Sequence, residues 1–495
     1  MPVALLAVLA AVTAARLIRY LMLSPRTLNV PYVKFEGNNS QARYTKEYRT
    51  LVDKGYYEYL RKGLPFSIRN PVDPKRPIVL LPMKYLEEVR SAPESKWSFP
   101  LFLERSTIIK EVGGPKMSQE ATHMARLDLN RALTNLIEPM QEECLAAYRV
   151  VMPPCPEWTS IQPYQFLLHM FTRITARVLV GPELCGSQDW LDVTLGYTNC
   201  VLKAIPKVRA TYHPSVRWLA RYIDKDARQV VKQRQRAAEV LRPIFDARIR
   251  NSKSPAEAGD AVQWLIEGYR AQGRKPTPEK LADDELSISV ASIHSSSATA
   301  LSTLFDLMDH PDSLAEIREE ISQVRKQYPT WNRNALGALK LLDSFMKESQ
   351  RIHSLTQLTM QRWAVSPVTF KDGFHIPAGT PISFANHQLN LDPDVHSHPT
   401  VFDAKRFSRR RKGADVTKYH FASVSDDSIN WGSGTHACPG RFLAQETLKL
   451  MFVHLLTHYE FKHPEEGQRR PTDNHHNFNF MPNVGASILF REKYF

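Results

Sequence analysis

The sequence predicts a mainly α-helical fold with small β-sheets, that is, an α+β protein. Through the middle of the chain, apolar residues recur at helical spacing between charged ones, for example over residues 228–250. Short runs of strand-forming residues lie outside this helical middle, at residues 77–81, 368–370 and 486–490. Helices should therefore form most of the core, with small β pieces near both ends of the chain.

The first 24 residues are predicted to form a transmembrane anchor. Residues 2–15 are apolar and uncharged, and the apolar stretch continues past Arg16 and Arg19 to Leu23. About 22 helical residues span about 33 Å, close to a bilayer core, and arginines near one end can snorkel to the interface. The basic residues that follow place the rest of the chain in the cytosol. A cleavable signal peptide is the alternative, because the arginine-free run is short and ends in small residues.

The rest of the chain is predicted to be one large domain on a tether. Pro25 and Pro31 restrict the backbone, so residues 25–37 should form a stiff connection. The chain has 495 residues, 43% hydrophobic and 23% charged, as expected for a globular protein. No internal repeat or long linker divides it, and the loosest stretch, residues 259–280, fades into helical pattern. We therefore expect a single domain over residues 38–495.

The net charge points to acidic partners. Lys and Arg (65) outnumber Asp and Glu (51), which gives +14. The excess is spread along the chain, with short clusters at residues 409–412 and 469–470. A dispersed excess is typical of a solvated surface and argues against nucleic-acid binding. An acidic protein surface and anionic lipid are the partners we expect instead.

A long helix is predicted over about residues 277–308. Thr277 supplies an N-cap and Pro278 fits the first turn. The centre of this helix, residues 291–297, holds four serines around His294, and serines are poor helix formers in a core element. A local conflict of this kind is expected at functional sites, but the hydroxyls could also simply bond to carbonyls one turn earlier.

The cysteines do not form a recognisable framework. Their odd number and the lack of CxxC pairs argue against disulfides and against a structural zinc site. All but the last are expected to be ordinary buried or half-buried thiols. The five are Cys144, Cys155, Cys185, Cys200 and Cys438.

Cys438 stands in the segment WGSGTHACPGR, directly before a stretch with apolar residues at helical spacing. Pro439 fits the first turn of that helix, so Cys438 is expected at the helix N-terminus, where the dipole favours a thiolate. Without a companion Cys or His, such a thiolate suits a metal that brings most of its own ligands, as haem iron does. Three glycines would let the backbone turn tightly and lie against something flat: Gly432, Gly434 and Gly440.

This segment resembles the haem-binding signature of the cytochrome P450 monooxygenases, F-G-x-G-x-x-x-C-x-G. Every glycine and the cysteine are in register, and Trp431 keeps the aromatic bulk of the usual phenylalanine. The resemblance implies that Cys438 is the axial ligand of haem iron and that His436 faces a haem propionate. It also implies the P450 fold, preceded by the N-terminal transmembrane helix.

Two further segments resemble motifs of the same family. Glu348 and Arg351 match its E-x-x-R motif, which places an acid and a base one helical turn apart. Residues 402–407, FDAKRF, resemble F-x-P-x-R-F, with Ala404 in place of proline. The resemblance implies that Arg406 joins the other two in a buried charge triad, a structural element that braces the core beside the haem.

The centre of the long helix resembles the family's oxygen-binding motif, A/G-G-x-D/E-T-T/S. Ala291 matches this motif. The departures are Ser292 for glycine, His294 for the acid, and Ser295 and Ser296 for the two alcohols. The resemblance implies catalytic roles for the last three residues, since a hydroxyl would bond dioxygen and His294 would pass protons near neutral pH. His294 could instead simply bond a neighbour. Similar stretches occur in ascomycete secondary-metabolism members of the family.

Two arginines resemble family residues that contact the haem propionates. Arg362, eleven residues after Arg351, resembles the arginine beside the substrate pocket, although a surface role is the alternative. Arg126 and His123 lie about where the family has a W-x-x-x-R pair, but neither the residues nor the spacing match well.

The resemblance implies a haem-thiolate monooxygenase that uses dioxygen and electrons from NADPH. NADPH–cytochrome P450 reductase would deliver the electrons, with cytochrome b5 as an optional second donor. The expected substrate is a small apolar molecule, first a terpenoid-type and next a polyketide intermediate of fungal secondary metabolism. The expected location is the endoplasmic reticulum membrane, with one span and a cytosolic catalytic domain. The alternatives are a reductase-independent haem-thiolate isomerase or dehydratase, and a membrane-anchored haem protein without catalysis.

Overall fold

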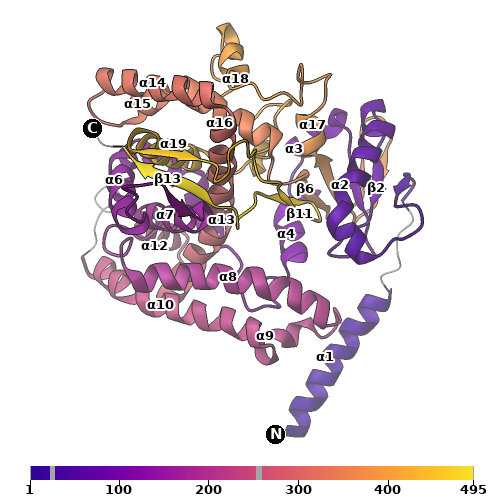
Figure 1. Ribbon diagram of the computed structural model, residues 1–495. Helices are drawn as coiled ribbons and strands as arrows, with labels where there is room; N and C mark the ends of the chain where they lie inside the picture. The colour runs from indigo at the N-terminus through magenta and orange to yellow at the C-terminus, as the bar shows by residue number, and fades with distance from the viewer. Residues whose placement is uncertain (1, 23–27, 252–258, 494–495) are drawn as a thin grey trace.

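The computed structural model describes residues 2–22, 28–251 and 259–493, and helices form most of it (Figure 1). The α-helices are α1 Pro2–Met22, α2 Gln41–Glu58, α3 Leu86–Ser91, α4 Phe99–Thr107, α5 Gln119–Arg126, α6 Asp128–Val151, α7 Pro163–Leu179, α8 Gln188–Thr211, α9 Ala220–Ile223, α10 Lys225–Asn251, α12 Ala261–Ala271, α13 Pro278–Asp309, α14 Pro311–Gln327, α15 Arg333–Ala338, α16 Lys340–Ile352, α17 Asn386–Asn390, α18 Arg406–Arg410 and α19 Arg441–His458. Short 3-10 helices are η1 Leu60–Lys62, η2 Met83–Tyr85, η3 Arg217–Leu219, η4 Gly413–Asp415 and η5 Gly434–His436.

The strands are short and form small sheets. They are β1 Tyr32–Val33, β2 Phe66–Ile68, β3 Ile78–Leu80, β4 Trp97–Ser98, β5 Thr159–Ile161, β6 Leu358–Ala364, β7 Val368–Thr369, β8 His375–Ile376, β9 Pro381–Ala385, β10 Tyr459–Lys462, β11 Asn474–His476, β12 Asn479–Met481 and β13 Ile488–Glu492. The largest sheet has the order β1-β2-β3-β9-β6-β4, and a second has the order β10-β13-β5. Two hairpins, β7–β8 and β11–β12, complete the β-structure of the described residues.

The helices and the largest sheet occupy different sides of the molecule. In Figure 1, α6, α7, α8, α10, α12 and α13 lie together on one side, and α2 with strands of the largest sheet lies on the other. The largest cluster of buried apolar side chains surrounds α13, which packs against α7, α10 and α16. Residues 297–307 of this helix are all buried, so α13 is the central element of the helical core.

The predicted fold class and several predicted elements are confirmed. Thr277 caps α13, because its hydroxyl accepts a hydrogen bond from the Lys280 amide at 3.3 Å, and the helix runs to Asp309. The segment at residues 228–250 lies within α10, with Pro243 inside the helix. The three strand predictions correspond to β3, β7 and β13. The stretch at residues 259–280, predicted to be the loosest part of the chain, contains the helix α12, which the sequence pattern did not reveal as a separate helix.

The predicted transmembrane helix is not found. Residues 2–22 of the segment form α1, and residues 1, 23 and 24 lie outside the described residues; among the described residues no helix is both long and apolar enough to cross a membrane. Arg16 interrupts the uncharged run after about 14 residues, or about 21 Å of helix, which is shorter than a bilayer core of about 30 Å. Residues 25–27 of the predicted tether lie outside the described residues. Farther along the tether, β1 pairs in parallel with β2 and so joins the largest sheet.

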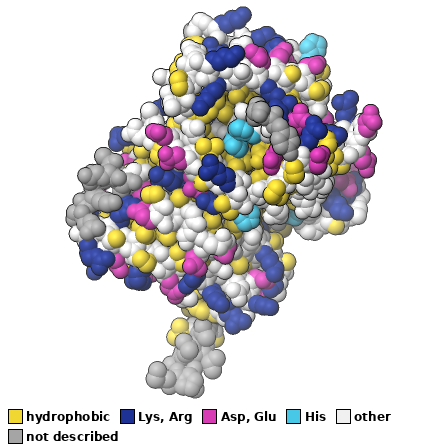
Figure 2. Space-filling view, turned by 60° about the vertical axis from the view of Figure 1, so that its left-hand side comes forward, with side chains coloured by type: hydrophobic (Ala, Val, Ile, Leu, Met, Phe, Trp, Pro, Cys, Tyr) yellow, Lys and Arg dark blue, Asp and Glu magenta, His cyan; other side chains and the backbone are white. Residues whose placement is uncertain are grey.

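Charged side chains are mixed on the molecular surface. Figure 2 shows Lys and Arg side chains scattered over one face, with Asp and Glu side chains between them. Several of these side chains pair at the surface, as Lys405 does with Glu316. The positive net charge is therefore dispersed over this face rather than gathered in one tract.

Candidate active site

Cys438 lies in a loop between η5 and α19. Its backbone amide donates a hydrogen bond of 2.7 Å to the Trp431 carbonyl, and the Arg441 guanidinium donates one of 2.9 Å to the Cys438 carbonyl. The helix begins at Arg441 with Gly440 as its N-cap, so Pro439 precedes the helix and does not stand in its first turn as predicted. These contacts hold the half-buried Cys438 directly in front of the helix N-terminus.

The environment of the Cys438 thiol combines two opposed influences. Burial raises its pKa, whereas hydrogen bonds from the backbone amides of Gly440 and Arg441 and the Arg441 charge lower it. The amides at the helix N-terminus thus act in the predicted direction, but burial outweighs them, and the pKa lies above its usual value in the protein alone. A bound metal cation reverses this balance, because a coordinating thiol loses its proton.

The backbone conformation favours glycine at two of the three glycine positions of the loop. Gly432 and Gly434 have φ angles of 74° and 66°, in the left-handed region. A Cβ at Gly434 would lie 2.8 Å from the Arg90 carbonyl oxygen, so the loop packs closely against α3 there. Gly440 has an ordinary φ of −85°, and a Cβ there would meet no atom within 4 Å. The loop therefore faces open space beside Gly440, next to Cys438.

Trp431 contributes packing and one backbone contact to the loop. Its indole N–H donates to the Phe421 carbonyl at 2.8 Å, and the two rings meet edge to face at 5.4 Å between centroids. The polar group that distinguishes tryptophan from phenylalanine is thus satisfied within the protein. This contact helps to fix the start of the Cys438 loop.

The three basic side chains expected near the haem propionates lie close to one another. Burial lowers the pKa of His436 to about 4, and the charges of Arg362 and Arg126 lower it as well. The Phe99 ring lies 5.7 Å from the Arg362 guanidinium and 5.9 Å from the His436 ring. Arg126, at the end of α5, donates a hydrogen bond to the Thr435 carbonyl in the Cys438 loop. The structure therefore brings these residues to the same side of the site.

Arg362 is a buried cation that forms no ion pair with a carboxylate among the described residues, and only the charge of Glu94 opposes the effect of burial on its pKa. Its side chain donates to the Gln361 carbonyl at 2.8 Å, the residue is 3% exposed, and burial lowers its pKa to about 10. A β-bulge places it here, because Met360 has a φ of 56° and the register of β6 against β9 shifts between Thr359 and Arg362. A buried guanidinium of this kind requires an anion, and a haem propionate meets that requirement. The open space at Gly440 and the cation at Arg362 both fit haem.

Replacing Arg362 by methionine is expected to weaken haem binding by about tenfold, the equivalent of one charge-assisted hydrogen bond. The free energy of unfolding of the haem-free protein should stay the same or rise by about 1 kcal/mol, because the change removes an unpaired buried charge. Haem titration followed by Soret absorbance and urea unfolding measure the two effects. The control is Arg411→Met, since Arg411 pairs with the buried Asp343, and this variant should unfold more easily by about 3 kcal/mol. Unchanged haem affinity in Arg362→Met would contradict the assignment.

The serines at the centre of α13 bond to the helix itself. The Ser295 hydroxyl donates to the carbonyls of Ala291 at 3.0 Å and Ser292 at 3.2 Å. Ser295 is exposed, and Ser296 is half-buried. The structure thus shows for Ser295 the hydroxyl-to-carbonyl bonding that the sequence left open as the alternative to a catalytic role.

His294 pairs with a tyrosine that sequence reasoning missed. Nδ1 of His294 lies 2.9 Å from the Tyr164 hydroxyl, which reaches it from the second residue of α7. Burial lowers the pKa of His294 and raises that of Tyr164 to about 12, so both are neutral near pH 7. Nε2 of His294 is buried and has no hydrogen-bond partner within the described part of the chain. Such an orphaned atom fits a site whose occupant the protein alone does not supply.

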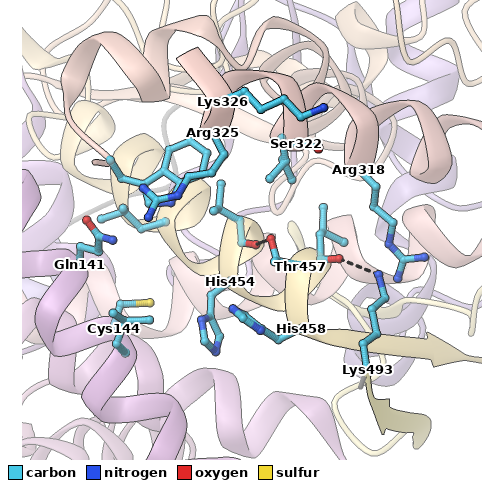
Figure 3. Close-up of a pocket in the computed structure, with 16 residues that line it drawn as sticks. Gln141, Cys144, Arg318, Ser322, Arg325, Lys326, His454, Thr457, His458 and Lys493 are labelled. Atoms are coloured by element: carbon cyan, nitrogen blue, oxygen red, sulfur yellow. Dashed lines mark hydrogen bonds between the residues drawn. The ribbon is translucent and has the colours of Figure 1, made fainter. Parts of the chain in front are cut away.

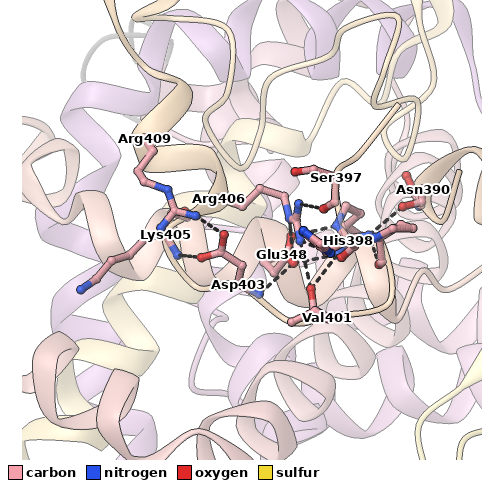
Figure 4. A network of polar contacts seen from close by, with 12 residues as sticks. Glu348, Asn390, Ser397, His398, Val401, Asp403, Lys405, Arg406 and Arg409 are labelled. Atoms are coloured by element: carbon pink, nitrogen blue, oxygen red, sulfur yellow. Dashed lines mark hydrogen bonds and ion pairs between the residues drawn. The ribbon is translucent and has the colours of Figure 1, made fainter. Parts of the chain in front are cut away.

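The predicted charge triad forms a buried network (Figure 4). Arg351 Nη2 lies 2.7 Å from Glu348 Oε1, and Arg406 Nε lies 3.0 Å from the same oxygen. The Glu348 side chain is fully buried, and those of Arg351 and Arg406 are 2% and 8% exposed. Other guanidinium N–H groups donate to the carbonyl of Asn390, the last residue of α17, and to carbonyls of the loop that follows: Ser397, His398, Pro399 and Val401. The network fastens this loop to α16.

Sequence reasoning missed Tyr164 and the bulge at Met360. Tyr164 stands 130 positions before His294 and carries no motif, so only the packing of α7 on α13 brings the two together. The bulge depends on a left-handed residue that is not glycine, which a sequence pattern does not reveal.

With this geometry established, comparison with known proteins identifies the family. The cytochrome P450 family model matches residues 102–490. Cytochrome P450 monooxygenase cheE of Chaetomium globosum is 40% identical, over 99% of this chain and 96% of its own. Pyrichalasin C-7 hydroxylase of Pyricularia grisea is 34% identical, over 88% of this chain and 87% of its own. The solved structure of a retinoic acid-bound cyanobacterial CYP120A1 has a TM-score of 0.70 at 16% identity, covers 94% of this chain and 100% of its own, and shows the shared fold.

The chain belongs to the cytochrome P450 family and is a cytochrome P450 monooxygenase. The cofactor of this family is haem held by a cysteine thiolate, and the electrons come from a reductase partner. The family and the P450 fold predicted from the Cys438 segment are therefore confirmed, as are the haem cofactor and the reductase.

Proposed function

We propose that this enzyme hydroxylates an apolar intermediate of fungal secondary metabolism, with Cys438 as the axial thiolate. The observation that carries the proposal is the half-buried Cys438 at the N-terminus of α19, in a loop that faces open space and lies near the unpaired Arg362. When bound, haem supplies the reductive activation of dioxygen. The chain itself contributes the thiolate, Arg362 and His436 toward the propionates, and Arg126 as a support of the loop.

For the substrate, the name of one relative suggests a candidate. One relative is named for hydroxylation of pyrichalasin at C-7. A pyrichalasin-like compound is therefore our first candidate, and a terpenoid-type intermediate, which the sequence pattern suggested, is the second. Deletion of the gene in its native host, followed by mass spectrometry, tests this proposal. The accumulated compound should be one oxygen lighter than the normal product, and accumulation of an isomer of the product would contradict hydroxylation.

The same preparation tests the competing reaction types. A monooxygenase with its reductase consumes NADPH when the accumulated compound is added, whereas an isomerase or dehydratase consumes none. An inactive haem-binding protein would leave the compound unchanged. Only substrate-dependent NADPH consumption with gain of one oxygen agrees with the proposal.

We propose that Tyr164 holds His294 in the tautomer that can take part in proton delivery. With its pKa raised by burial, the Tyr164 hydroxyl keeps its proton and donates to Nδ1, which leaves the His294 proton on Nε2. Nε2 is then available to a group bound in the site. Proton delivery of this kind is general acid catalysis by a positioned side chain.

Tyr164→Phe is expected to lower the yield of product per NADPH about fivefold, the equivalent of a hydrogen bond of about 1 kcal/mol. In ¹⁵N-histidine NMR spectra of the haem-free protein, His294 should change from one tautomer to a mixture. The control is Tyr148→Phe, since Tyr148 is also buried and donates to the Met451 carbonyl at 2.9 Å. If Tyr164→Phe leaves both the yield and the tautomer unchanged, Tyr164 only fills space.

We also propose that the enzyme works at the endoplasmic reticulum membrane, with its catalytic domain in the cytosol and with cytochrome b5 as a second electron donor. In support, α1 exposes Val8, Val12, Leu17 and Ile18, an apolar surface suited to lipid. Fractionation of cells that express the full chain, or a chain that starts at residue 28, tests the location. The full chain should sediment with membranes and the shortened chain should not.

A further inference from the structure

A cavity lies along the second half of α19, away from the Cys438 loop. It has a volume of about 580 Å³ and is enclosed by α6, α14 and the second half of α19 (Figure 3). Leu450, which lines it, stands nine residues after Arg441, or about 13 Å along the helix axis. The cavity is therefore separate from the Cys438 site, and its volume falls within the range of small-molecule pockets.

One part of the cavity lining is apolar. The Trp331 ring, 8% exposed, and the fully or largely buried side chains of Leu450 and Val453 form this part. Cys144, 2% exposed, contributes a thiol whose pKa burial raises, so it behaves as another apolar group. A hydrocarbon body would find a matching surface here.

The rest of the lining is cationic. Arg318, Arg325 and Lys326 project from α14, and Lys493 reaches the cavity from the C-terminal segment (Figure 3). The lining of the cavity, within the described residues, includes no Asp or Glu. The nearest acid that influences Arg318 and Lys493 is Glu460, and it is paired with Arg491 at 2.5 Å.

Two of these cations are incompletely satisfied. Arg318 donates through Nη2 to the Tyr459 carbonyl at 2.9 Å, but its Nε is buried without a hydrogen-bond partner in the described structure. Lys493 donates to the Leu456 carbonyl at 3.2 Å. Burial lowers the pKa of both groups, and Arg318 lowers that of Lys493 further, whereas the more weakly acting Glu460 raises both.

The histidines of the cavity do not compensate this charge. Burial lowers the pKa of His454 to about 4, and burial and the Lys493 charge lower that of His458. Both are therefore neutral near pH 7, and their rings lie 4.5 Å apart between centroids, tilted by 41°.

We propose that this cavity binds a small amphiphilic anion, one carboxylate or phosphate group attached to an apolar body. The anionic group contacts Arg318 and Lys493, with Lys326 at the rim, and the body lies against Trp331 and Leu450. An anion alone would leave the apolar wall exposed, and a neutral hydrocarbon would leave Arg318 Nε unpaired, so both parts of the ligand are needed.

Isothermal titration calorimetry of the haem-loaded enzyme with dodecanoate tests the proposal. The haem iron is first saturated with an azole ligand, so that binding outside the Cys438 site is measured and the Soret band stays constant. One site per protein is expected. Dodecanol, which lacks the charge, and inorganic phosphate, which lacks the body, should each bind at least tenfold more weakly. If inorganic phosphate bound as tightly as dodecanoate, the proposal would be overturned, because the cavity would then be a simple anion site.

Variants locate the site. Arg318→Gln combined with Lys493→Gln should weaken dodecanoate binding at least tenfold, and Ser322→Trp, at the exposed rim, should do the same by blocking entry without a charge change. The control is Lys371→Gln, an exposed lysine on the β7–β8 hairpin, which should bind as the parent does. The proposal fails if Ser322→Trp binds normally. It also fails if the double variant slows reduction by the reductase but binds dodecanoate unchanged, since the cations would then serve the reductase.

Discussion

Cys438→Ser is expected to reduce product formation on the order of a thousandfold or more. Serine keeps the size of the side chain, but its hydroxyl neither ionises readily nor donates electron density to iron as a soft thiolate does. The loop itself should persist, because its hydrogen bonds to Trp431 and Arg441 use the backbone of residue 438. The measurement is product per minute with saturating reductase and NADPH, together with the unfolding temperature of the haem-free protein.

The matched control is Cys200→Ser. Cys200 is also a free, half-buried cysteine, and burial raises its pKa as it raises that of Cys438. Activity should remain within about twofold of the parent, because this thiol lies on α8 and has no role in the proposed site. If Cys438→Ser kept more than a tenth of the activity while Cys200→Ser lost it, the wrong cysteine would have been assigned.

Glu348→Ala is expected to lower the free energy of unfolding by about 3–5 kcal/mol. The change leaves the guanidinium groups of Arg351 and Arg406 buried without an anion, and it removes the acceptor for the Asp403 amide at 3.0 Å. The loop with Ser397 and Val401 should loosen, because both arginines bind its carbonyls. Urea unfolding of the haem-loaded protein measures the loss.

Glu316→Ala provides the control on the same side of the molecule. Glu316 pairs with Lys405 at 2.6 Å, but both side chains are 48% exposed, and such pairs contribute about 0–1 kcal/mol. If Glu348→Ala and Glu316→Ala lowered the free energy of unfolding by similar amounts, burial of the triad would not be the cause of its contribution to stability.

Some elements could be predicted from sequence because their determinants are local. Thr277 and Pro278 mark the start of α13 through capping and a fixed φ, which neighbouring residues decide. Glu348 and Arg351 are one turn apart on any helix, so their pairing follows once α16 forms. The Cys438 loop was recognised because its spacing is a motif in itself.

Other features depend on tertiary structure and had no local signal. Tyr164 meets His294 only through the packing of α7 against α13. Arg362 owes its position to the bulge at Met360. The sequence predicts that the helix N-terminus favours the Cys438 thiolate, and its amides do lower the pKa, but burial, which the sequence does not display, outweighs them. At the N-terminus, the apolar composition predicts a membrane span, but Arg16 interrupts the uncharged run, and no described helix is long and apolar enough to cross a membrane.

The central claim is that Cys438 holds haem iron as a thiolate. The carbon monoxide difference spectrum of the reduced, haem-loaded protein tests it most directly. The parent protein should show the thiolate-type band, Cys200→Ser should show the same band, and Cys438→Ser should lose it. A thiolate-type band that persists in Cys438→Ser, or its absence from the parent, would contradict the account.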